Sequence, residues 1–89
     1  MQTIQFQRKQ NLSFNRIDDE VVLLHLEKGM YYGMDSVGSR LWELLTLPHT
    51  LETLVQAVQI EYEVDEAVCR QDVALFIETL QKNDMLEVA

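Results

Sequence analysis

Residues 20–42 read EVVLLHLEKGMYYGMDSVGSRLW, and this stretch predicts a strand, a tight turn, a second strand and a helix in direct succession. The continuous apolar run at residues 21–24 predicts that the first strand is covered on both faces at its start. The turn at residues 27–29 contains Gly29, which readily adopts the positive φ that a tight hairpin needs. Asp35 is a good helix N-cap, because its carboxylate can accept hydrogen bonds from exposed backbone N–H groups.

The second of these strands has the sequence MYYGM, residues 30–34, and we expect it to end its sheet with no strand beyond it. An unpaired strand edge still presents backbone N–H and C=O groups, so it can dock an extended peptide as an added strand. Tyr31 and Tyr32 are adjacent and therefore face opposite sides of the sheet. One of them can enter the core while the other lines a surface. Peptide capture is accordingly the leading functional hypothesis.

Three helices are predicted after these strands. The first follows Asp35, the second is capped by Thr50, and the third is capped by Asp65. Gly38, in the first helical turn, costs stability relative to alanine and is expected to allow a close approach of that helix to the sheet. The third helix has an apolar stripe at helical spacing, formed by Cys69, Val73, Phe76, Ile77 and Leu80.

The ends of the chain are less regular. Leu12 and Phe14 alternate with polar residues, which indicates a half-buried strand, and residues 1–11 are expected to be a flexible arm or an extra strand. Residues 85–88 can fold back as a tail. The predicted class is therefore α+β, a three-stranded antiparallel sheet followed by three helices with winged helix-turn-helix proportions. Residues 1–89 are expected to form a single domain.

The bulk composition limits the classes of function. With 89 residues, 47% of them apolar, the chain can bury one small core. No apolar run is long enough to cross a bilayer, and no signal segment opens the chain. The single cysteine excludes an internal disulfide, so we expect a reducing, cytoplasmic setting. The net charge of −8 argues against nucleic acid and anionic membranes, because the seven basic residues are scattered and the predicted third helix is itself acidic.

A carrier protein is an alternative. Residues 33–37, Gly-Met-Asp-Ser-Val, resemble the signature in which a serine at a helix start carries phosphopantetheine, which would make Ser36 the modified residue. Carriers place a long helix and a long loop before that serine, whereas residues 12–34 here alternate as strands do. Asp35 and Ser36 are equally well explained as a helix N-terminus.

The sequence contains no local signature of a metal site or of a catalytic site. His25, His49 and Cys69 are the strongest soft-metal ligands, but they fall on a strand, a loop and a helix without close spacing. Cys69 is expected in the core, and His25 near the sheet edge. No partnered nucleophile, phosphate-binding loop or paired-carboxylate motif is evident, so we expect neither an enzyme nor a bound cofactor.

Taken together, residues 19–24, 26–34 and 37–45 resemble the PqqD-like family, named for the pyrroloquinoline quinone biosynthesis protein D. Residues 50–55 and 73–80 resemble its second and third helices. Members of this family are also called precursor-peptide recognition elements of ribosomally made, modified peptides (RiPPs). The likeness covers about residues 12–86 and consists of apolar and glycine positions.

This resemblance implies a function. Such domains bind the leader segment of a precursor peptide as an extra strand and present the rest to a leader protease and a modifying enzyme. A stand-alone chain with a Tyr-Tyr-Gly strand is most similar to the recognition proteins of lasso-peptide clusters, which work with a macrocyclase. Asp72 would favour a basic or hydroxyl-bearing leader residue. The implied peptide-binding residues are Met30, Tyr31, Tyr32, Gly33, Met34, Cys69, Asp72, Val73 and Phe76.

Overall fold

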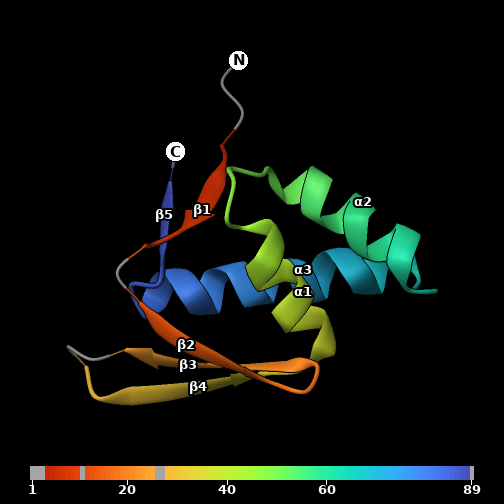
Figure 1. Ribbon diagram of the computed structural model, residues 1–89. Coiled ribbons are helices and arrows are strands. Elements are labelled where there is room, and N and C mark those ends of the chain that lie inside the picture. Colours follow the sequence, from red (N-terminus) through yellow and green to blue (C-terminus); the bar gives the residue numbers. More distant parts are fainter. Residues whose placement is uncertain (1–3, 11, 26–27, 89) are drawn as a thin grey trace.

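A computed structural model describes residues 4–10, 12–25 and 28–88, and it has the predicted α+β class (Figure 1). The helices lie over one face of a three-stranded sheet, and a second, smaller sheet joins the two ends of the chain. In chain order the elements are β1 (Phe6–Arg8), β2 (Ser13–Ile17), β3 (Glu20–His25), β4 (Met30–Met34), α1 (Ser36–Leu44), α2 (Leu51–Glu61), α3 (Glu66–Lys82) and β5 (Leu86–Val88).

The larger sheet is antiparallel with the order β2–β3–β4, so β3 is its central strand. The two-residue turn after β2 holds Asp18 at a φ of 56°, a left-handed conformation that aspartate tolerates better than most residues. Gly29, which precedes β4, has a φ of 62° and so confirms the predicted role of glycine there. Residue 27 of the predicted turn lies outside the described residues.

The prediction of one sheet followed by three helices was incomplete, because β1 and β5 form a second antiparallel sheet. In its register Phe6 lies opposite Val88. The Phe6 N–H also donates to the C=O of His49 at 2.7 Å, and the Arg8 N–H donates to the C=O of Leu45 at 2.9 Å. Strands of three residues show too little alternation to be recognised, and their partners are far away in sequence. Of the two possibilities foreseen for residues 1–11, an extra strand is correct for β1.

Arg8 ties this second sheet to α1 and β2. Its guanidinium lies 4.8 Å from the ring centre of Phe14 and 5.0 Å from that of Trp42, within the range of a cation–π contact. Its Nη1 donates to the C=O of Trp42 at 3.1 Å. The two rings meet edge to face, with centroids 5.9 Å apart. One arginine therefore joins three segments of the chain.

Three predictions about burial were wrong. In β3, Val21 and Leu23 are buried but Val22 and Leu24 are only half-buried, because helices cover one face of the sheet alone. The residues of β2 are exposed rather than half-buried, since β2 is an edge strand. His25 lies on the central strand, not at the sheet edge, and is 4% exposed.

All three predicted N-caps are confirmed: the side chains of Asp35, Thr50 and Asp65 each accept a hydrogen bond from the N–H three residues later. The predicted stripe of α3 enters the core, with Phe76 half-buried and the other four members buried. None of the described helices has the length and apolar character needed to cross a membrane. The winged helix-turn-helix arrangement stays a prediction.

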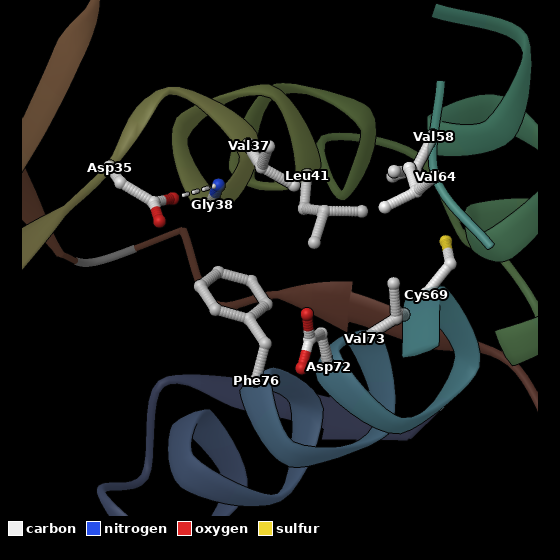
Figure 2. A pocket seen from close by; sticks show the side chains of 10 residues that line it. All are labelled: Asp35, Val37, Gly38, Leu41, Val58, Val64, Cys69, Asp72, Val73 and Phe76. Carbon is white, nitrogen blue, oxygen red and sulfur yellow. Dashed lines mark hydrogen bonds between the residues drawn. The ribbon is translucent and has the colours of Figure 1, made fainter. Parts of the chain in front are cut away.

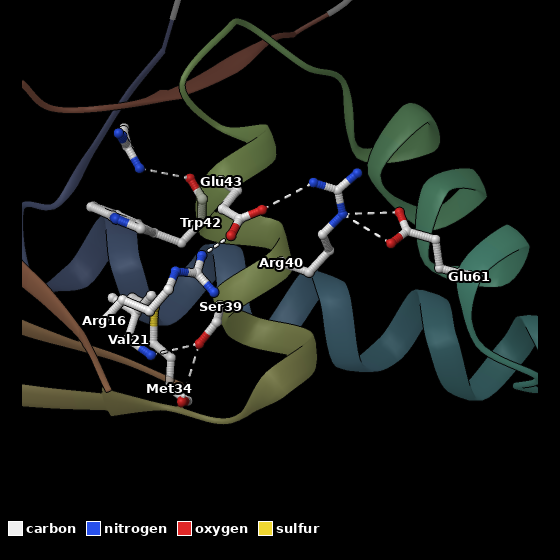
Figure 3. Close-up of polar contacts among 9 residues, drawn as sticks. Arg16, Val21, Met34, Ser39, Arg40, Trp42, Glu43 and Glu61 are labelled. Carbon is white, nitrogen blue, oxygen red and sulfur yellow. Dashed lines mark hydrogen bonds and ion pairs between the residues drawn. The ribbon is translucent and has the colours of Figure 1, made fainter. Parts of the chain in front are cut away.

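A buried serine joins α1 to the sheet (Figure 3). The hydroxyl of Ser39 accepts from the N–H of Val21 at 2.8 Å and donates to the C=O of Met34 at 3.3 Å. Ser39 is 1% exposed, so water cannot replace it at these two groups. The first turns of α1 are thus hydrogen-bonded to both β3 and β4.

Ser39→Ala should lower the free energy of unfolding by about 1–3 kcal/mol, because a buried backbone N–H loses its acceptor. Urea unfolding followed by the fluorescence of Trp42 measures the change. Ser36→Ala is the matched control, since Ser36 is exposed on the same helix and its loss should cost less than about 0.5 kcal/mol. Equal costs for the two variants would contradict the role given to Ser39.

Candidate peptide-binding edge and groove

β4 is an edge strand. All five of its residues pair with β3, from Met30 opposite His25 to Met34 opposite Val21, and no other described strand pairs with it. The two end strands, which could have covered its free side, pair with each other instead (Figure 1). In the described part of the chain, the edge that the sequence predicts is therefore open.

The backbone groups of Tyr31 and Gly33 are inferred to point toward this open side. In an antiparallel pair, successive residues direct their N–H and C=O alternately toward and away from the neighbouring strand. The Ser39 hydroxyl bridges the N–H of Val21 and the C=O of Met34, so these two groups are directed toward each other. By alternation, Tyr31 and Gly33 have their hydrogen-bonding groups on the other side.

The side chains of β4 divide between two faces, as adjacent strand residues must. Tyr32 is half-buried and packs against the core, and Met34 is 4% exposed. Tyr31, by contrast, is 75% exposed. The tyrosine pair therefore behaves as predicted, with one ring toward the core and the other on the surface.

An apolar groove lies between α1 and α3, beside the end of β4 (Figure 2). It encloses about 230 Å³. A cavity of roughly 150 Å³ is already large enough to hold benzene, so this groove can take one large apolar side chain. Its lining residues are Asp35, Val37, Gly38, Leu41, Val58, Val64, Cys69, Asp72, Val73 and Phe76.

Gly38 brings α1 and α3 close together at the mouth of the groove. A Cβ atom at this position would lie 3.2 Å from Cε1 of Phe76, 3.3 Å from Oδ1 of Asp35 and 3.4 Å from Cβ of Met34. The predicted close approach of the helix to the sheet is confirmed at Met34, and the structure adds the contact with the Phe76 ring. A larger residue at position 38 would have to displace that ring.

The polar groups of the groove are acidic. Asp35 Oδ1 accepts from the N–H of Gly38 at 2.8 Å, which places it at the helix cap, while Asp72 is exposed. Cys69 is 2% exposed, and its Sγ lies 3.7 Å from the C=O of Val55. Burial raises the pKa of the Cys69 thiol, and the negative charge of Asp72 raises it further. The thiol is therefore protonated at neutral pH.

The four groove residues implied on α3, Cys69, Asp72, Val73 and Phe76, do line one cavity. Sequence reasoning missed the contributions of the other segments, because packing alone brings them together. Of the groove residues outside α3, only Gly38 stood out in the sequence, because it is a glycine inside a predicted helix. The missed residues are Asp35, Val37, Leu41, Val58 and Val64.

Two alternatives gain no support. Among the described residues, no group of three or more His, Cys, Asp or Glu could hold a metal ion, so His25, His49 and Cys69 are not gathered into a site. Ser36 begins α1 directly after three strands, not after the long helix of a carrier protein. Asp35 caps that helix, which is the structural role that the same motif predicts.

Fold and site thus define a small α+β domain with an open strand edge beside an apolar groove. The model of the family described as coenzyme PQQ synthesis protein D (PqqD) matches residues 20–86, so the chain belongs to the PqqD family. The resemblance noted in the sequence is confirmed. No curated protein sequence matches the chain.

Three solved structures share the fold. TbiB1 in complex with the TbiA(beta) leader peptide is 41% identical, with a TM-score of 0.81 over 91% of this chain and 94% of that one. A lasso peptide synthetase B1 complexed with its leader peptide is 24% identical, with a TM-score of 0.78 over 92% and 96%. The PqqD truncation of Methylobacterium extorquens PqqCD, a RiPP recognition element, is 18% identical, with a TM-score of 0.74 over 93% and 88%.

Cys69 should react with the disulfide reagent DTNB at least about tenfold more slowly in the folded protein than in urea, because burial shields the thiol and its raised pKa leaves little thiolate. The absorbance of the released thiolate at pH 8 gives the rate. The signal has one source, since the chain contains a single cysteine. Equal rates in the two states would show that Cys69 is not part of the buried lining.

Proposed function

We propose that this protein is a non-catalytic binding protein that captures the leader segment of a ribosomally made precursor peptide by adding it as a strand to β4. The observation that carries the proposal is the open edge of β4 beside an apolar groove. TbiB1 supports it, because that protein is 41% identical and was solved with a leader peptide bound. The proposed contact residues are Met30, Tyr31, Tyr32, Gly33 and Met34 on the edge and Cys69, Asp72, Val73 and Phe76 in the groove.

Main-chain pairing would supply affinity with little sequence preference. The guest strand would exchange hydrogen bonds with the outward N–H and C=O groups of Tyr31 and Gly33. Alternate guest side chains would then face the helices, and the one nearest the end of β4 would enter the groove. That side chain would supply the specificity, because burying a Leu- or Phe-sized group stabilises a complex by about 1.5–3 kcal/mol.

Binding would order a disordered leader, which opposes part of this gain and keeps the complex reversible. Reversibility suits a protein that hands its guest to enzymes. We propose that a leader protease and a modifying enzyme, such as a macrocyclase in a lasso-peptide pathway, act on the tethered precursor. Tethering raises the effective concentration of the attached core peptide near a bound enzyme.

We also propose that residues 1–89 act as one peptide-recognition domain. The pairing of β1 with β5 supports this, since it joins the two ends of the chain. Phe6, in β1, packs against the same core cluster as Tyr32, in β4. A segment that is part of the core cannot be separated from the binding site without a loss of stability.

Tyr31→Pro should abolish binding of the leader, whereas Tyr31→Ala should largely retain it. Proline removes one outward N–H from the edge, while alanine keeps the backbone and shortens only an exposed side chain. The probe is a fluorescein-labelled synthetic peptide with the sequence of the N-terminal half of a short open reading frame identified next to this gene, and binding is followed by anisotropy. If a folded Tyr31→Pro variant binds as tightly as the alanine variant, strand addition to β4 is wrong.

Gly38→Ala should weaken binding of the same peptide without a loss of stability, because the added methyl displaces the Phe76 ring at the groove mouth. The gain of up to about 1 kcal/mol in helix propensity offsets the cost of the contact. Thermal melting and anisotropy separate the two effects.

Ser36→Ala is the matched control for this experiment, since Ser36 is exposed on the same helix and does not line the groove. A double-mutant cycle with Phe76→Leu completes the test, because two residues in contact should have non-additive effects on affinity. Additive effects of Gly38→Ala and Phe76→Leu would show that the ring does not transmit the change.

A further inference from the structure

We propose that the leader segment carries a lysine or arginine on the same face of the added strand as the apolar side chain that fills the groove, and that this cation pairs with the carboxylate of Asp72. The inference rests on the function proposed above and specifies the chemistry of the guest. Both side chains lie on one face of the added strand: the apolar one enters the groove, and the cation stays at its rim.

The lining of the groove suits an apolar side chain inside it and a charged side chain only at its rim. Seven of its side chains are apolar or thiol groups, so a charge inside would be desolvated without a partner. Asp72 is the polar group that reaches this space from α3: it is exposed, and its carboxylate projects between α1 and α3 (Figure 2). A lysine or arginine can lay its methylenes along the apolar rim and keep its charge at the carboxylate.

Among the described residues, no basic side chain forms an ion pair with the carboxylates that line the groove. The groove lining contains no Lys, Arg or His, and Asp72 takes part in none of the ion pairs found within the described ranges. The nearest arginine in sequence, Arg70, pairs with Glu52 and Glu66 instead. Asp35 is engaged as the cap of α1. Asp72 is thus the groove carboxylate that remains available to a guest.

The rest of the molecule favours a cation over a neutral hydroxyl group. The net charge is −8, and five of the seven basic side chains are held in ion pairs on the protein itself, namely Lys9, Arg16, Arg40, Arg70 and Lys82. Arg8 is held between the rings of Phe14 and Trp42. The remaining negative field attracts a basic peptide from solution, whereas a hydroxyl-bearing residue gains nothing from it.

The test uses the labelled leader peptide described above, titrated against the wild type, Asp72→Asn and Glu87→Gln at about 50 mM and about 500 mM NaCl. Asp72→Asn should weaken binding about three- to tenfold at the lower salt, and the difference should shrink at the higher salt. Glu87→Gln removes an exposed carboxylate from β5, in the other sheet, and should leave the affinity nearly unchanged.

The lysines and arginines of the peptide are then replaced one at a time by glutamine. One replacement should be non-additive with Asp72→Asn, which identifies the paired cation. Unchanged affinity of Asp72→Asn at low salt, or additivity at every basic position, overturns the inference. If Tyr31→Pro still abolishes binding in that case, strand addition stands and only the cation is wrong. A peptide that does not bind the wild type overturns both proposals.

Discussion

The first turns of α1 hold the molecule together at the point where the sheet meets the helices. Asp35 caps the helix directly after β4, Gly38 lets α3 come into contact, and the Ser39 hydroxyl bridges β3 and β4. Asp35, Gly38 and Ser39 together restrict the placement of the helix, since Ser39 hydrogen-bonds to buried backbone and a Cβ at position 38 would lie only 3.2 Å from the Phe76 ring.

The same arrangement leaves one strand edge free. An exposed edge is a liability in most proteins, because it can pair with a second copy of the chain. Here β4 is only five residues long and contains a glycine, and the protein carries a net charge of −8, so like copies repel. These features oppose self-association while keeping the backbone available to a peptide of different charge.

The strands near the two ends of the chain, β1 and β5, pair with each other rather than with β4. Because β1 hydrogen-bonds to β5 and to the segment after α1, the terminal segments of the described chain are committed elsewhere in the fold. The Arg8 guanidinium between Phe14 and Trp42 reinforces that commitment with contacts to both β2 and α1. The open edge is therefore a consequence of how the rest of the backbone satisfies its own hydrogen bonds.

The sequence by itself determined the elements that depend on neighbours in the chain: the three helix caps, the left-handed Gly29, the apolar stripe of α3 and the strand MYYGM. Each of these reflects a local periodicity or a local backbone requirement. Only the tertiary structure decided the β1–β5 pairing, the burial of one face of β3 and the groove lining from Val37 to Val64, because each joins residues that are distant in sequence. Such contacts form when distant segments pack together, and they produce no regular spacing of residues from which they could be predicted.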